Sequence, residues 1–235
     1  MKLGPNLIRA ICFISALFTL NLYAAEIYRV TQIEGFARNL TESVEVLLQV
    51  GDKIQGGSTI ATGEKSALVL VGQNGQVFKL NSNSRIELGV EADHAKLIEG
   101  NTFIRIEKRQ ASESKKPVFQ LRTRTAVLGV RGTLFFAGVT SKPVQEGEPK
   151  KAMGDPFPQN TWMCVREGQV EVSTKDHRAN VKAGEGLFVE PGKSFAPKHF
   201  EWPNQLNWNF DPAKGAILNP KWTDAAKKEA AGTKP

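Results

Sequence analysis

Short runs of alternating apolar and polar residues fill most of the chain between residues 25 and 195. Apolar side chains at every second position are typical of a β-strand with one buried face. Gly, Asn and Asp residues separate the runs, and Asn74-Gly75 gives the clearest hairpin because this pair favours positive backbone φ angles. No window in this region has a long helical period with caps. The pattern predicts an all-β fold, either a two-sheet sandwich or a short β-roll of antiparallel hairpins.

The most informative stretch is residues 119–139. Its first part alternates and places Arg122 and Arg124 on the more polar face of a half-buried strand, whereas the apolar run 134–139 predicts a strand buried on both faces. Two glycines bracket Arg131, and glycine inside a strand pattern marks a bulge or a sharp bend. The donors of Arg131 need partners. This arginine either ties loops together through backbone carbonyls or forms an anion site with Arg122 or Arg124.

The first 24 residues have the composition of a secretory signal peptide. Lys2 and Arg9 supply positive charge, an apolar run from residue 10 to residue 20 follows, and residues 22–24 offer a cleavage site. The run is shorter than the roughly 20 residues that a spanning helix needs. We therefore expect cleavage after Ala24 and a periplasmic or secreted protein without a transmembrane segment. The alternative is an uncleaved leader that acts as a poor membrane anchor.

The remaining chain divides by composition into a domain and a tail. Residues 25–196 carry the strand pattern, interrupted at 141–160 by a proline- and lysine-containing segment that we interpret as a surface loop insertion. After residue 197 the pattern ends, and three tryptophans stand among prolines: Trp202, Trp208 and Trp222. We expect an irregular C-terminal tail, 197–235, whose tryptophans dock on the β-domain and whose last residues fray.

Charge and reactive side chains give little support to nucleic-acid binding or catalysis. The net charge is +7, or +5 without Lys2 and Arg9, and the basic residues lack the interleaved aromatics of single-strand binders. The three histidines have no metal-ligand spacing, and no phosphate-loop or dinucleotide motif is present. Cys164, the one cysteine after the leader, is expected to pack as a small hydrophobe, with a reactive pair to His177 as the alternative. We predict a protein that is not an enzyme and has no metal site or cofactor.

Several glycine-containing segments occur in the order found in one known family. They are Val50-Gly-Asp-Lys-Ile-Gln-Gly-Gly-Ser-Thr-Ile-Ala-Thr-Gly63, residues 66–70 with Gly75, residues 97–101, 125–135, 165–170 and 181–185. Gly129-Val-Arg-Gly-Thr133 is the most specific part. In these segments, which together cover roughly residues 30 to 190, the chain resembles the FecR domain family.

The resemblance implies an all-β domain outside the cytoplasm that binds another envelope or secreted protein or relays a signal. Regulators of this family carry the domain behind a cytoplasmic anti-sigma segment and a transmembrane helix. This sequence has a leader there instead, so we do not expect direct sigma-factor control. The resemblance supplies no catalytic residues. The alternative function is a structural or cell-wall domain that binds peptidoglycan or another glycan by stacking sugars on Trp202, Trp208 or Trp222.

Overall fold

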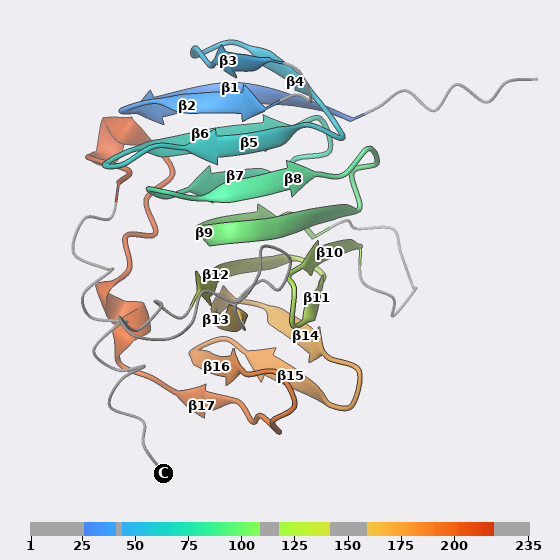
Figure 1. Cartoon of the computed structure of the whole chain (residues 1–235). Coiled ribbons are helices and arrows are strands. Elements are labelled where there is room, and N and C mark those ends of the chain that lie inside the picture. Colours follow the sequence, from blue (N-terminus) through green and yellow to red (C-terminus); the bar gives the residue numbers. More distant parts are fainter. Residues whose placement is uncertain (1–25, 41–43, 109–117, 142–158, 219–235) are drawn as a thin grey trace, which may run out of the picture.

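The computed structural model describes residues 26–40, 44–108, 118–141 and 159–218. The predicted signal peptide, almost all of the predicted loop insertion at 141–160, and Trp222 with the end of the tail lie outside the described residues. The described part consists of β-strands and two short 3-10 segments, which confirms the all-β prediction (Figure 1). Within it, no helix is long and apolar enough to cross a membrane.

The strands are β1 (Ile27–Glu34), β2 (Ala37–Leu40), β3 (Glu45–Leu47), β4 (Lys53–Gln55), β5 (Thr59–Thr62), β6 (Ala67–Gly72), β7 (Val77–Leu80), β8 (Arg85–Leu88), β9 (His94–Ile106), β10 (Phe119–Arg122), β11 (Val127–Val130), β12 (Thr133–Ser141), β13 (Gln159–Glu167), β14 (Gln169–Ser173), β15 (Arg178–Lys182), β16 (Glu185–Val189) and β17 (Lys198–His199). The 3-10 segments are η1 (Trp202–Gln205) and η2 (Pro212–Lys214).

The strands form two stacked sheets. Sheet A has the order β4-β1-β6-β7-β9-β12-β13-β16-β17. Sheet B has the order β3-β2-β5-β8-β9-β10-β11-β14-β15. The chain moves repeatedly from one sheet to the other as it advances along the stack, from β1–β4 at one end to β15–β17 at the other (Figure 1). This path is that of a β-roll. The pairing of β9 with β10 is parallel, whereas the other pairings are antiparallel.

Strand β9 belongs to both sheets and holds them together. Its first half pairs in sheet B and its second half, from Gly100, pairs in sheet A. In the sequence, Glu99-Gly100-Asn101 stands between the runs 96–98 and 102–106 and predicts a turn between two strands, but the strand continues and changes sheet there. Gly100 has a φ of +74°, and a Cβ atom at this position would lie 2.4 Å from the Ser84 hydroxyl and 2.5 Å from the Asn83 carbonyl oxygen. Glycine therefore permits both the backbone conformation and the close approach.

The main core lies between the sheets and is built from alternate residues of each strand. Phe119 and Leu121 point into it, as the alternation in the sequence predicts. The apolar run 134–139 is buried on both faces, also as predicted. Phe135 packs in the core between the sheets, whereas Phe136 points to the outer face of sheet A. That outer face must therefore be covered by something else.

Residues 200–218, which we call the strap, cover the outer face of sheet A. The strap leaves β17 and runs back along the stack until it lies beside the first strands (Figure 1). Its buried side chains are Trp202, Leu206 and Ile217. Trp202 and Leu206 pack with Phe103, Phe136, Trp162 and Cys164 in a second core cluster. The prediction that an irregular tail docks on the β-domain is confirmed for this part of the tail.

Candidate functional site

The first end of the roll exposes several apolar side chains close to one another in the chain. Four of them, which we call the apolar edge, belong to β3 and its flanks: Val44 (57% exposed), Val46 (49%), Leu47 (66%) and Val50 (63%). All three residues of β3 are exposed. Among the described residues, β3 pairs with β2 alone, so its other side is an open strand edge. Open apolar edges are binding sites or aggregation hazards, and monomeric proteins normally blunt them.

Local contacts hold this edge in an extended conformation. Arg38 on β2 forms an ion pair with Glu45 on β3. At the following turn, the Asp52 side chain accepts a hydrogen bond of 2.8 Å from the Gln49 backbone amide. The edge is thus presented by a fixed hairpin. In an antiparallel strand, alternate N–H and C=O groups point away from the one partner and can bond to another strand.

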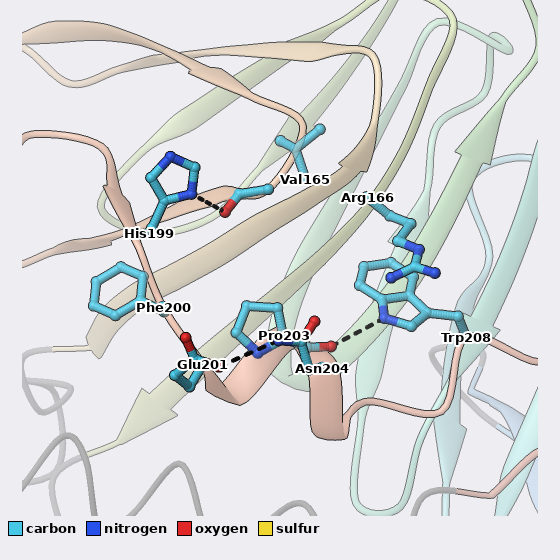
Figure 2. Close-up of a pocket in the computed structure, with 9 residues that line it drawn as sticks. Val165, Arg166, His199, Phe200, Glu201, Pro203, Asn204 and Trp208 are labelled. Carbon is cyan, nitrogen blue, oxygen red and sulfur yellow. Dashed lines mark hydrogen bonds between the residues drawn. The ribbon is translucent and has the colours of Figure 1, made fainter.

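A cleft of about 320 Å³ lies at the other end of the roll, between β13, β17 and the strap (Figure 2). Arg166, Glu201, Asn204 and Trp208 contribute to its lining. The Trp208 indole donates a hydrogen bond of 3.1 Å to the Pro203 carbonyl oxygen, which fixes the ring. We call this the Trp208 cleft. An aromatic ring among charged and amide side chains suits a small polar ligand with one apolar face.

The tryptophans proposed for sugar stacking have different environments. Trp202 is 2% exposed and packs against Phe136 and Trp162, with ring centroids 6.1 and 5.1 Å away. It cannot stack a sugar in this conformation, because its faces are already covered. Trp208 is half-buried, with its ring edge-to-face to Phe103, and it lines the cleft. Trp222 lies outside the described residues.

The three arginines singled out in the sequence start from different positions: Arg122 on β10, Arg124 in the turn after it and Arg131 after β11. Arg122 is exposed on β10, opposite Val127 in the first register position of β11, whereas Arg131 follows the last residue of β11. The intervening four residues separate their backbones by about 13 Å. The anion site of Arg131 with Arg122 or Arg124 stays a prediction. Arg131 is half-buried in the turn before β12, where its backbone carbonyl accepts a hydrogen bond from the Thr133 hydroxyl.

Arg124 lines a second cleft of about 270 Å³, formed by the β10–β11 turn, the β14–β15 turn and the segment after β16. Its charged neighbours there are Lys175, Asp176, Glu190 and Lys193. Lys193 is paired with Glu190. Two carboxylates thus offset much of the positive charge, and the cleft lacks the concentration of cations that would select an anion.

Cys164 and His177 lie in different parts of the roll. Cys164 is buried on the outer face of sheet A beneath the strap, and this burial raises the pKa of its thiol. His177 lies in the turn between β14 and β15, with its ring edge-to-face to Phe195. The geometry does not form the Cys-His pair that the sequence left open. In the described ranges, no three His, Cys, Asp or Glu side chains are grouped closely enough to hold a metal ion.

Lys79 is the notable side chain that the sequence pattern missed. The alternation of β7 places it on the outer face of sheet A, where lysine normally meets water. The strap covers it completely, so that it is 0% exposed. Its Nζ donates to the backbone carbonyl oxygens of Asn207 and Asn209, the latter at 2.7 Å. Burial lowers the pKa of Lys79 to about 7, while Glu34 acts in the opposite direction.

Comparison with known proteins identifies the class of domain. Residues 58–148 match the family model described as FecR protein. The resemblance seen in the sequence is thereby confirmed for this segment. Two crystal structures of a candidate anti-sigma factor from Parabacteroides distasonis ATCC 8503, at 2.50 and 1.65 Å resolution, are similar to this chain. The identities are 20% and 21%, over 66% of this chain and 69% of that chain, with a TM-score of 0.46 in both cases. No curated protein matches the sequence.

Proposed function

We propose that this chain is an exported FecR-type module that binds another protein of the bacterial envelope and so takes part in relaying a signal. The observation that carries this proposal is the apolar edge. Of the large apolar side chains in the described residues, few others are exposed, because the strap covers the outer face of sheet A. The edge is thus the prominent surface at which a partner protein would gain free energy by excluding water.

The geometry favours a partner segment in an extended conformation. Such a segment would add to the open side of β3 through backbone hydrogen bonds, while Val46 and Leu47 on opposite faces supply side-chain contacts. Burying one Leu side chain contributes roughly 2 kcal/mol, which corresponds to about thirtyfold in affinity. The composition of the leader supports export with cleavage after Ala24, to the periplasm or the cell exterior.

The test is quantitative capture from an envelope extract by three forms of the tagged protein. Leu47→Asp places a charge in the proposed interface, and Lys182→Asp places the same side chain, with reversal of a charge, at an exposed position on β15, at the opposite end of sheet B. We expect the wild type and the Lys182 variant to recover the same dominant partner, and the Leu47 variant to recover less than a tenth of it. Equal recovery by all three forms would rule out the apolar edge.

The Trp208 cleft supports a second candidate function, binding of a glycan. A sugar ring has an apolar face for the indole and hydroxyls for Arg166, Glu201 and Asn204, all of which line the cleft. Cosedimentation with purified peptidoglycan tests this function. Loss of sedimentation in Arg166→Ala, with retention in Lys182→Ala, would support it, and the absence of sedimentation by the wild type would refute it.

A further inference from the structure

The strap is attached to the two sheets in a way that allows it to detach. Beyond β17, it makes its backbone hydrogen bonds within short local turns, such as Asn204 N to Glu201 O and Gly215 N to Pro212 O. Its side chains hold its own loop as well, since Asn207 donates to the carbonyls of Ala216 and Leu218. Because no ladder of backbone hydrogen bonds joins residues 200–218 to sheet A, the strap can leave without unpairing a strand.

Among the described residues of the β-domain, Lys79 is one of two whose side chains form hydrogen bonds with the strap backbone. The strand pairings place Val69, Lys79, Phe103 and Phe136 side by side across the outer face of sheet A. The Lys79 ammonium donates to two strap carbonyls and lies 4.1 Å from the centroid of the Phe103 ring and 5.4 Å from that of Phe210. Lys79 forms no ion pair with a carboxylate in the described part of the chain, so its direct partners there are carbonyl dipoles and aromatic faces, with the Glu34 carboxylate acting from a longer distance.

Glu34 on β1 is the second side chain that binds the strap backbone. Its two carboxylate oxygens accept hydrogen bonds of 2.7 and 2.9 Å from the backbone amides of Ile217 and Leu218. This carboxylate is committed to the end of the strap, and the buried Ile217 side chain beside it packs on Ala67 and Val69. The strap is therefore fixed by a cation near its middle and an anion at its end.

We propose that residues 207–218 form an acid-released latch over the aromatic outer face of sheet A. Closure buries the Lys79 ammonium, and opening returns it to water. At a pH where Lys79 is partly neutral in the closed form, its amine therefore takes up a proton when the latch opens. With a pKa of about 7 in the closed form and 10.5 as the ordinary value, the closed state is favoured most above about pH 10.5. This preference is lost as the pH falls through about 7.

The other charged groups that face this part of the strap have contacts of their own. Glu34 accepts hydrogen bonds from two backbone amides, and the Arg105 guanidinium on β9 lies 5.0 Å from the centroid of the Phe210 ring. Asp211 accepts a hydrogen bond from the Ala213 amide at the start of η2, and Lys214 is exposed. Release would expose Phe103 and the adjacent aromatic cluster, a face distinct from the apolar edge.

Hydrogen exchange measured by mass spectrometry on the full chain tests the latch. Wild type and Lys79→Met are compared at equal pH from 6 to 9, so that the intrinsic pH dependence of exchange cancels. As the pH falls from 9 to 7, we expect the ratio of wild-type to variant exchange in residues 207–218 to rise by up to about tenfold per pH unit, the value for uptake of one proton. The ratio should level off below pH 7, while β12 stays protected throughout.

Two further variants test whether the pH dependence comes from the titration of Lys79. Lys79→Gln retains a donor for the strap carbonyls but has no titratable proton, so its exchange relative to Lys79→Met should not depend on pH. Lys53→Met removes an exposed lysine on β4 and should keep the wild-type dependence. A pH-independent ratio for the wild type, or loss of protection in β12 together with the strap, would overturn the proposal.

Discussion

Gly138 offers a sharp test of how the outer face of sheet A is packed. It lies within β12, opposite Trp162 of β13. A Cβ atom at this position would lie 2.4 Å from the Nε1 and Cε2 atoms of the Trp162 indole, well inside any normal contact distance. The Trp162 ring packs between the rings of Phe136 and Trp202, with centroid distances of 4.9 and 5.1 Å. It therefore cannot move without displacing Trp202, which belongs to the strap.

We therefore expect Gly138→Ala to destabilise the protein although alanine suits a β-strand better than glycine. Overpacking of this kind costs about 1–3 kcal/mol. For a domain of this size, each kcal/mol lowers the melting temperature by about 2–4 °C. Urea unfolding followed by circular dichroism measures the change in the free energy of unfolding. An unchanged or increased stability would show that the indole has room to move.

A double-mutant cycle tests whether the clash with Trp162 causes the loss of stability in Gly138→Ala. Trp162→Leu shortens the clashing side chain and creates its own cavity, which is destabilising alone. In the double variant, the Cβ atom of residue 138 occupies part of that cavity. The two changes should therefore cost at least 1 kcal/mol less together than the sum of the single changes, a typical coupling for residues in contact. Additivity within about 0.5 kcal/mol would contradict the packing described here.

Two other predictions concern groups on the same face of sheet A. Glu34→Gln should raise the rate of hydrogen exchange at the Ile217 and Leu218 amides by about tenfold, because a neutral amide oxygen is a weaker acceptor than a carboxylate. Strand β12 should stay protected. Unchanged exchange would exclude Glu34 as a side chain that holds the strap. The Cys164 thiol should resist iodoacetamide at pH 8.5 in the folded protein and react in urea, because burial raises its pKa. Mass spectrometry of the Cys164 peptide reports this reaction, and rapid labelling of the folded protein would be the contrary result.

The strand architecture could be predicted because its signals are local. The Asn74-Gly75 turn lies between β6 and β7, and the alternation at residues 119–122 corresponds to β10. The turn expected at residues 99–101 is absent because a glycine with a positive φ angle serves equally well at a bend that moves one strand between sheets. Local sequence cannot distinguish these two uses of glycine.

The environments of Lys79 and Trp202 could not be predicted from the sequence because they depend on contacts between distant segments. Lys79 and its acceptor Asn207 are 128 residues apart in the chain. The alternation of β7 correctly gives the face on which Lys79 lies, but only the docked strap makes that face buried. The same contact accounts for Trp202, which the sequence made a candidate for sugar binding and which the structure uses for packing. The apolar edge could not be predicted because the sequence does not show which strands have a neighbour on both sides. Val44, Val46 and Leu47 have the pattern of an ordinary strand, and the pairing of β3 with β2 on one side is seen only in the structure.

Site-specific photocrosslinking in living cells tests the proposed function most directly. A photoreactive amino acid is placed at Leu47 on the apolar edge and, in a separate strain, at Lys182 on β15. The account predicts one dominant protein adduct from position 47, which is absent from position 182 and is lost when Val46→Asp is added. No adduct at position 47, or the same adducts from both positions, would contradict the claim that this edge binds a partner.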